Sequence, residues 1–429
     1  MTDKRHEELT ARRQSLLGKA YRLFYQQPLH IVRGEGAWLF DADGKQYLDA
    51  YNNVPHVGHC HPKVVEAISR QAGVLNTHTR YLHENVLDYA ERLLARFPPE
   101  LNTAMFACTG TEANELAVRI ARAATGARGI IAVDYAYHGN STLMAQISPS
   151  DRPVESIDDR VEIVSCPDLY RGEFRGDDSG QLYADAVSRG IQALADRGHG
   201  TAAFIMDTNL SSNGQPRIPA DWLPLVIDRL HAVGALFIAD EVQPGFGRLG
   251  THFWGFEKLG VMPDLVTMGK PMANGYPMSA VVTRAELAET FDQRSRYFNT
   301  FGGNPVASSA AAAVLDVLEE EHLQQNAREV GGRLESGFQA LAERFEYLGE
   351  VRGSGLFWGL DLVRDRASRE PALALATTVI EALREEGVLI GSAGQHDNVL
   401  KIRTPMCLSM EQADFLLDRL QRVMARQVS

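Results

Sequence analysis

Two charged residues follow strongly apolar runs, and their types and positions make them candidates for chemistry. Asp240 follows the run at 235–239, and Lys270 follows the run at 265–268 after one glycine. Because a charged group at the end of a buried strand is costly to bury alone, each residue needs a partner or a chemical use. A lysine there can form a Schiff base with an aldehyde cofactor, and an aspartate can pair with a protonated pyridine nitrogen. For the lysine alone, a structural ion pair is the simpler interpretation.

Two further stretches carry groups that suit the rest of such a cofactor. Thr109-Gly110-Thr111-Glu112 precedes a helical pattern, and a helix start offers free N–H groups and a positive dipole end to a phosphate. Tyr137-His138-Gly139 follows another apolar run, where an aromatic ring can stack on a flat ring. Separately, these are an ordinary helix start and a core aromatic residue. Together, the four stretches predict a site for pyridoxal 5'-phosphate.

The elements that would position these residues alternate along the middle of the chain. Apolar runs at 105–108, 130–133, 161–164, 202–206, 235–239, 265–268 and 279–282 are separated by amphipathic stretches at 112–124, 181–196 and 219–232. This alternation predicts a doubly wound α/β sheet, mostly parallel, with ligands beyond the carboxyl ends of its strands.

The C-terminal third has a different pattern. Residues 304–345 predict a long helix, because they are rich in Ala, Leu and Glu. Strand-like runs at 356–363 and 388–391 and a helix at 411–426 predict a smaller domain, which the segment before about residue 60 would join.

Length, charge and cysteine content limit the class of protein. A chain of 429 residues predicts two domains, or one large domain with a smaller one appended. A net charge of −12 argues against nucleic-acid binding and requires a local cluster of arginines for any anionic substrate. Apolar runs are too short for a membrane span, and the N-terminus lacks the apolar region of a secretory signal. Four widely spaced cysteines predict free thiols in a reducing cytoplasm: Cys60, Cys108, Cys166 and Cys407.

With all four motifs in this order, the chain resembles the class III (subgroup II) aminotransferases of pyridoxal-phosphate fold type I. The matching stretches are Thr109–Asn114, Tyr137–Gly139, Asp240–Arg248 and Met268–Lys270. The resemblance implies a large domain with a mostly parallel seven-stranded sheet flanked by helices, and a smaller α+β domain. It places the N-terminal segment at 1–60, the large domain at 61–305, and the connecting helix with the small domain at 306–429.

The resemblance also implies roles for residues around the cofactor ring. Lys270 would form the Schiff base and later move protons, and Asp240 would pair with the pyridine nitrogen. Gln243 would reach the ring hydroxyl.

Further roles concern the cofactor phosphate, the ring face and the neighbouring subunit. Gly110 and Thr111 would bind the phosphate, and Tyr137 would stack on the ring with His138 beside it. Thr300 resembles the family residue that reaches the cofactor phosphate of the neighbouring subunit, so a homodimer with shared sites is expected.

Several stretches look more like the branch of this family that eliminates phosphate from phosphorylated amines. They are Asn52–Pro62, Asn76–Glu84, Met268–Pro277 and Asn398–Cys407. Many aminotransferases of the family carry EPxxGExG, whose later Glu can neutralise the arginine that binds carboxylate. Ser212 stands at that position here. A lyase uses one substrate and can keep this arginine charged throughout.

The sequence therefore predicts elimination of phosphate from O-phosphoethanolamine, giving acetaldehyde, ammonia and phosphate. The alternatives are a class III ω- or β-amino-acid transaminase with a 2-oxo acid acceptor, and a lyase for phosphohydroxylysine. A non-catalytic binding protein is disfavoured, because Lys270 and Asp240 are both present.

The substrate phosphate needs cations, and arginine binds phosphate through two parallel hydrogen bonds. Arg403 matches the family's substrate-anion arginine, and Arg80 is the second candidate, although a surface role is usual for any single arginine. Tyr25, Asn52 and Asn53 are weaker candidates for the cleft wall.

The spacing of His56, His59 and His61 could indicate a zinc site. However, prolines flank this stretch and no fourth ligand is apparent, so we expect no metal.

Overall fold

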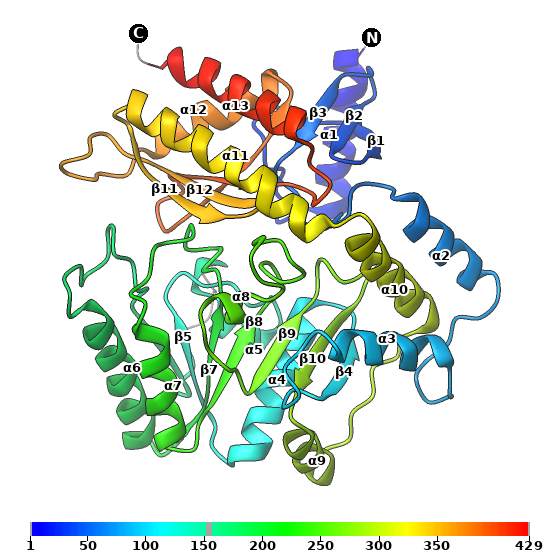
Figure 1. Cartoon of the computed structure of the whole chain (residues 1–429), viewed down its shortest axis with the longest axis vertical. Coiled ribbons are helices and arrows are strands. Elements are labelled where there is room, and N and C mark those ends of the chain that lie inside the picture. The colour runs from blue at the N-terminus through cyan, green and yellow to red at the C-terminus, as the bar shows by residue number, and fades with distance from the viewer. Residues whose placement is uncertain (1, 152–156, 428–429) are drawn as a thin grey trace.

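The computed structural model describes residues 2–151 and 157–427. The middle of the chain forms a seven-stranded sheet (Figure 1). The strand order is β4-β10-β9-β8-β7-β5-β6. Only β10 runs antiparallel to its neighbours β4 and β9, so the prediction of a mostly parallel sheet is confirmed. The strands are β4 (Thr103–Ala107), β5 (Gly129–Val133), β6 (Val161–Val164), β7 (Thr201–Asp207), β8 (Leu236–Asp240), β9 (Leu265–Met268) and β10 (Ser279–Thr283).

Helices cover both faces of this sheet because its strands are apolar on both faces. Successive side chains of a strand point to opposite faces, and Ile130 and Ile131 accordingly belong to two different buried clusters. One cluster includes side chains of α4 (Gly110–Thr125), α5 (Thr142–Gln146) and α9 (Ala285–Arg294). The other includes α6 (Ser179–Asp196) and α7 (Trp222–Ala232). A 3-10 helix, η1 (Pro149–Asp151), and α8 (Gly255–Lys258) lie in the connections.

The C-terminal segment forms a second sheet with strand order β11-β12-β15-β14. Its strands are β11 (Leu348–Ser354), β12 (Phe357–Leu362), β14 (Gly391–Ala393) and β15 (Val399–Arg403). Figure 1 shows this sheet, with α11 (Leu323–Arg344), α12 (Leu373–Glu385) and α13 (Met410–Ala425), lying over one end of the large sheet.

The N-terminal segment pairs with this C-terminal part, as predicted. β1 (Ile31–Glu35), β2 (Trp38–Asp41) and β3 (Gln46–Asp49) continue into β13 (Val388–Leu389), which runs parallel to β3. The chain begins with α1 (Thr2–Leu17), and α2 (Pro62–Ala72) and α3 (Glu84–Leu94) pack on α10 (Pro305–Glu320). The domain limits at residues 60 and 305 stay a prediction.

The single long helix predicted over 304–345 is wrong. The chain forms two helices, α10 and α11, separated at Glu321 and His322. His322 has a φ of 52°, a left-handed conformation that a right-handed helix cannot contain. The break lets α10 pack on α2 and α3 while α11 packs on β11 and α13.

A buried carboxylate on β12 connects the C-terminal sheet to the seven-stranded sheet. Asp361 on β12 accepts hydrogen bonds from Arg171 Nη1 (2.8 Å) and Nη2 (2.7 Å), and Arg171 belongs to the loop after β6. Asn398 Nδ2 (2.8 Å) and Arg352 also donate to Asp361. These bonds fix β12 and its neighbour β15 over the carboxyl ends of the large sheet.

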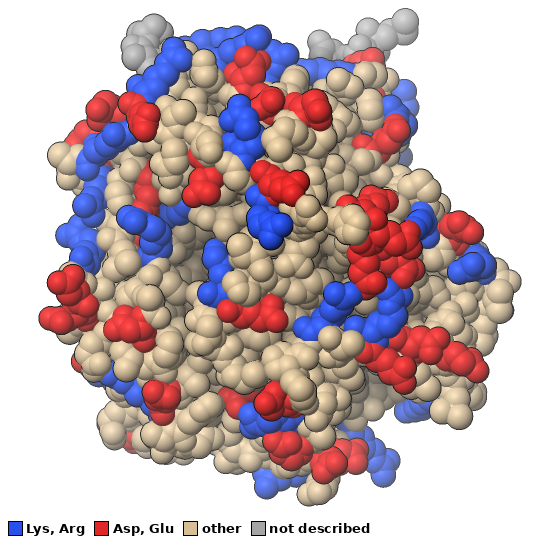
Figure 2. Space-filling model, viewed as in Figure 1, with Lys and Arg blue, Asp and Glu red and all other residues tan. Residues whose placement is uncertain are grey.

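On the face drawn in Figure 2, acidic and basic side chains are interspersed over much of the surface. All four cysteines, which lie within the described residues, are unpaired. No helix in the described part of the chain is long and apolar enough to cross a membrane.

Candidate active site

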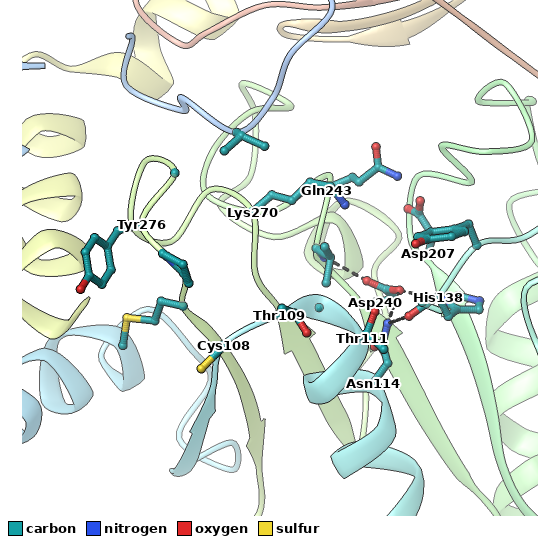
Figure 3. A pocket seen from close by; sticks show the side chains of 18 residues that line it. Cys108, Thr109, Thr111, Asn114, His138, Asp207, Asp240, Gln243, Lys270 and Tyr276 are labelled. Atoms are coloured by element: carbon teal, nitrogen blue, oxygen red, sulfur yellow. Dashed lines mark hydrogen bonds and ion pairs between the residues drawn. The ribbon is translucent and has the colours of Figure 1, made fainter. Parts of the chain in front are cut away.

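A cavity of about 350 Å³ lies at the carboxyl ends of the large sheet (Figure 3). Several of its walls come from the residues that end or follow β4, β5, β7, β8 and β9, which is where a doubly wound sheet binds ligands. Residues lining it include Thr109, Gly110, Thr111, Asn114, Tyr137, His138, Asp207, Asp240, Val242, Gln243 and Lys270. Seven predicted cofactor residues therefore meet in one cavity.

The start of α4 offers backbone donors to this cavity. Glu112 Oε2 accepts from the N–H groups of Cys108 (2.7 Å) and Thr109 (3.0 Å), and Thr109 Oγ1 accepts from Glu112 N–H (3.2 Å). This capping box leaves the N–H groups of Gly110 and Thr111 without a partner among the described residues. Unpaired N–H groups at a positive helix end form an anion site that suits a phosphate.

The loop after β5 passes close to this helix start. Asn140 N–H donates to Thr111 Oγ1 (3.4 Å). Gly139 makes the approach possible, because a Cβ added there would lie 2.9 Å from Thr111 Cα. Its φ of 145° also lies in the range that favours glycine.

We expect Gly139→Ala to weaken retention of the predicted cofactor about 10-fold or more, since the added Cβ displaces the helix start and strain of this kind costs about 1–3 kcal/mol. Dialysis followed by cofactor absorbance would measure the loss. Gly126→Ala is the matched control, because Gly126 ends α4 with a φ of 72° and no atom lies within 4 Å of its added Cβ. An equal loss in both variants would contradict the steric explanation.

Asp240 is held by several donors at the end of β8. His138 Nδ1 lies 2.8 Å and Asn114 Nδ2 2.9 Å from Asp240 Oδ2, and Val242 N–H donates to Oδ1 (3.0 Å). Asn114 also donates to His138 O (2.7 Å) and accepts from Thr267 Oγ1 (2.5 Å). This network fixes a carboxylate that is 3% exposed, where it can pair with a cationic ring nitrogen.

Lys270 follows β9 and extends into the cavity (Figure 3). Its side chain is exposed to water within the cavity, although protein groups surround it. Burial lowers the pKa of Lys270 below its ordinary value, and the positive charge of Arg403 lowers it further, while Asp240 and Asp207 oppose the shift. A lysine with a lowered pKa is more readily the neutral amine that attacks an aldehyde.

Asp207 is a second buried carboxylate at the cavity. It ends β7 directly opposite Asp240 in the strand register, and its oxygens accept from the N–H groups of Asn209 (2.9 Å) and Ser211 (3.0 Å). Burial raises the pKa of Asp207, and the neighbouring charge of Asp240 raises it further. The negative charge at this edge therefore favours a cationic group on a bound ligand.

Arg403 reaches the cavity wall from β15. Its Nη1 donates to Gln243 Oε1, and its Nη2 donates to Tyr51 O (2.8 Å). No carboxylate pairs with Arg403 among the described residues, so its charge is available to an anion. Burial lowers the pKa of Arg403 to about 10, which leaves the guanidinium charged at neutral pH.

Arg403 contacts the cavity lining through Gln243, and none of the predicted substrate residues is itself part of that lining. Asn53 is buried beside Val54, which does line the cavity, and its Nδ2 has no partner among the described residues. Tyr25 donates to Ile390 O (2.9 Å), which lies between β13 and β14. Arg80 is exposed and lies over the Phe298 ring at 3.8 Å.

Thr300 is also exposed, two residues from Phe298. Thr300 and Arg80 therefore lie outside the cavity of their own chain. Their roles in binding stay predictions.

Two buried polar residues of the site received no role from the sequence, namely Asn114 and Asp207. Asn114 lies one helical turn after Gly110, on the face of α4 that meets β9, and this spacing was the available signal. Asp207 directly follows an apolar run, as Asp240 does.

The three histidines of the loop before α2 bind separate partners. His56 contacts Phe246 O (2.8 Å) and Arg248 (3.0 Å), His59 pairs with Asp49 (2.7 Å), and His61 pairs with Glu321 (2.9 Å). Across the described ranges, no group of three or more His, Cys, Asp or Glu side chains could hold a metal ion.

The donor set fits pyridoxal 5'-phosphate. The N–H groups of Gly110 and Thr111 suit its phosphate, the Asp240 carboxylate suits its pyridine nitrogen, and the Lys270 amine suits its aldehyde. Tyr137 and Val242 also line the cavity and supply surfaces for a flat ring.

Comparisons with known proteins agree with this fit. A sequence model of the aminotransferase class-III family matches residues 23–424. A Drosophila melanogaster protein named alanine–glyoxylate aminotransferase 2-like is 43% identical, over 94% of this chain and 84% of its own length. A Caenorhabditis elegans protein named ethanolamine-phosphate phospho-lyase homolog 1 is 39% identical, over 94% of this chain and 90% of its own length. A solved structure of a phospholyase from Arthrobacter in complex with phosphoethanolamine has a TM-score of 0.94 and 44% identity, and the match covers 97% of this chain and 99% of that one.

Proposed function

Since this chain belongs to the class III aminotransferases, a family that uses pyridoxal 5'-phosphate, we propose that it is a lyase eliminating phosphate from O-phosphoethanolamine. The observation that carries the proposal is Arg403, which is held at the cavity wall and paired with no carboxylate in the described part of the chain. Ser212 stands where an acidic residue could neutralise it. The Arthrobacter phospholyase and the C. elegans homologue support the same reaction.

Different residues of this chain would bind different parts of the cofactor. Gly110 and Thr111 would hold the phosphate, Tyr137 the ring face, and Asp240 the ring nitrogen, while Lys270 provides the amine for attachment. When bound, the cofactor withdraws electrons from the carbon next to the substrate nitrogen, which makes a proton on that carbon acidic.

Lys270 would accept this proton at its Nζ. Arg403 would bind the phosphate group on the adjacent carbon. The carbon–oxygen bond then breaks, and its electron pair leaves with the phosphate. Water completes the conversion, so one O-phosphoethanolamine and one water give acetaldehyde, ammonia and phosphate.

We expect purified protein to release phosphate and acetaldehyde in equal amounts from O-phosphoethanolamine with no 2-oxo acid present. Malachite-green and aldehyde assays would measure both products. The proposal fails if no phosphate appears and the cofactor absorbance instead changes and stays changed until a 2-oxo acid is added.

A class III transaminase of ω- or β-amino acids is the second candidate. The name of the 43%-identical Drosophila relative favours it. Phosphohydroxylysine is a further candidate substrate, because the elimination is the same and only the pocket beyond the reacting carbon differs.

We also propose a homodimer with shared sites. An exposed apolar surface lies around Arg80 and Thr300, and it includes Tyr81 (66% exposed), Leu82 (96%) and Phe301 (67%). Burial of this surface against a second copy would remove apolar area from water and bring Thr300 toward the partner's cavity.

A further inference from the structure

Lys401 is a second cation on the same face of β15 as Arg403. Residues two apart in a strand share a face. Both side chains approach the buried Phe357 ring, with Lys401 Nζ 5.7 Å and Arg403 Cζ 5.6 Å from its centroid. Arg403 bonds to Gln243 at the cavity wall, so its face of β15 turns toward the cavity. Lys401 lies on that same face of the sheet formed by β11, β12, β15 and β14.

The residues beside Lys401 on the neighbouring strands are glycines, and other segments of the chain pack closely on them. Its directly opposite residues are Gly359 on β12 and Gly391 on β14. A Cβ at Gly391 would lie 2.9 Å from the Tyr51 ring, and one at Gly359 would lie 2.9 Å from Gly214 O. Tyr51 and the loop that follows β7 therefore approach the sheet on either side of Lys401.

A buried amide without partners lies in the same region. Gln215 is 4% exposed, and neither its Oε1 nor its Nε2 has a hydrogen-bond partner among the described residues. Its Oε1 lies 3.4 Å from the position of a Cβ at Gly359, directly opposite Lys401. A buried amide of this kind is costly unless a ligand or water completes its hydrogen bonds.

The amino group of Lys401 lacks a partner as well. No hydrogen bond or ion pair of its Nζ occurs within the described ranges. Burial lowers the pKa of Lys401 well below its ordinary value, and the charges of Arg403 and Lys270 lower it further, while Asp207 opposes them. An anion placed between Lys401 and Arg403 would remove this repulsion and supply the missing acceptor.

We propose that Lys401 and Arg403 together bind the phosphate group of the substrate, with Gln215 donating an additional hydrogen bond. This inference rests on the proposed lyase function, and it adds the residue that selects a phosphate monoester. A phosphate monoester carries about 1.5 to 2 negative charges at pH 7, so two cations balance it. A carboxylate carries one charge, and Arg403 alone can balance it.

The test uses cofactor-loaded protein, so that the cofactor's own phosphate site is filled. We expect Lys401→Met to raise KM for O-phosphoethanolamine about 10- to 100-fold, with a smaller change in kcat, because a charged hydrogen bond to the phosphate is lost. Calorimetry should show a similar loss of affinity for inorganic phosphate. Affinity for acetate, a single negative charge, should change less than about threefold.

Lys258→Met is the matched control, because Lys258 bonds to Ser354 Oγ (2.6 Å) and does not line the cavity. It removes the same charge and should leave phosphate affinity unchanged. If Lys401→Met does not fold, Gln215→Glu offers a second variant of nearly the same shape, and its added negative charge should weaken phosphate binding at least about 10-fold.

Unchanged phosphate affinity in Lys401→Met, or equal losses for phosphate and acetate, would overturn the inference. So would the absence of any phosphate binding to the unaltered protein at millimolar concentration. Phosphate binding needs no turnover, so it separates the two proposals. Protein that binds phosphate through Lys401 but releases none from O-phosphoethanolamine would refute the lyase and keep the site.

Discussion

Lys270→Ala should lose activity by at least about 10³-fold, since one side chain supplies both the attachment point and the proton acceptor. The absorbance band of the attached cofactor should disappear in the same variant. The cavity loses a long side chain and keeps its walls, so a small amine such as methylamine should restore part of the activity. Steady-state assays and absorbance spectra of dialysed protein would measure both effects.

Lys258→Ala serves as the control, because it removes a lysine bonded to Ser354 Oγ (2.6 Å) outside the cavity. It should keep the absorbance band and most of the activity. A Lys270→Ala protein that retained the band would show that another amine holds the cofactor, and the site as described here would be wrong.

The positions of the large-sheet strands could be predicted because burial on both faces leaves a continuous apolar run. The runs at 130–133 and 265–268 coincide with β5 and β9 within one residue. The importance of Asp240 and Lys270 could be predicted for the same reason, because a charged residue at the end of such an apolar run is costly to bury without a partner. The geometry of a doubly wound sheet then brings the strand ends together.

Interactions made across the sheets could not be predicted in the same way. No glycine or proline marks the break between α10 and α11 in the sequence. His322 adopts a left-handed conformation there, and the helices on either side pack on different elements. Lys401 and Arg403 alternate with apolar residues in Val399–Arg403, which places them on one face. The sequence could not show that this face turns toward the cavity, because that orientation depends on contacts between the two sheets, such as those of Arg171 with Asp361.

Asp240→Asn should reduce the rate about 10²- to 10³-fold while the protein still folds and binds cofactor. Asparagine keeps the shape of the side chain, and its oxygen can still accept from Asn114 or from Val242 N–H. It carries no negative charge, however, so the ring nitrogen would lose the partner that keeps it protonated. Measurement of kcat and of cofactor content would separate a loss of chemistry from a loss of binding.

Asp207→Asn is the most informative comparison, because Asp207 lies opposite Asp240 in the register of β7 and β8 and is also buried. Its oxygens accept from backbone N–H groups of its own loop, whereas Asn114 and His138 contact Asp240. We therefore expect Asp207→Asn to slow the reaction less than about 10-fold. If both variants lost activity equally, the total negative charge at this edge would matter more than the position of one carboxylate, and the role given to Asp240 would be wrong.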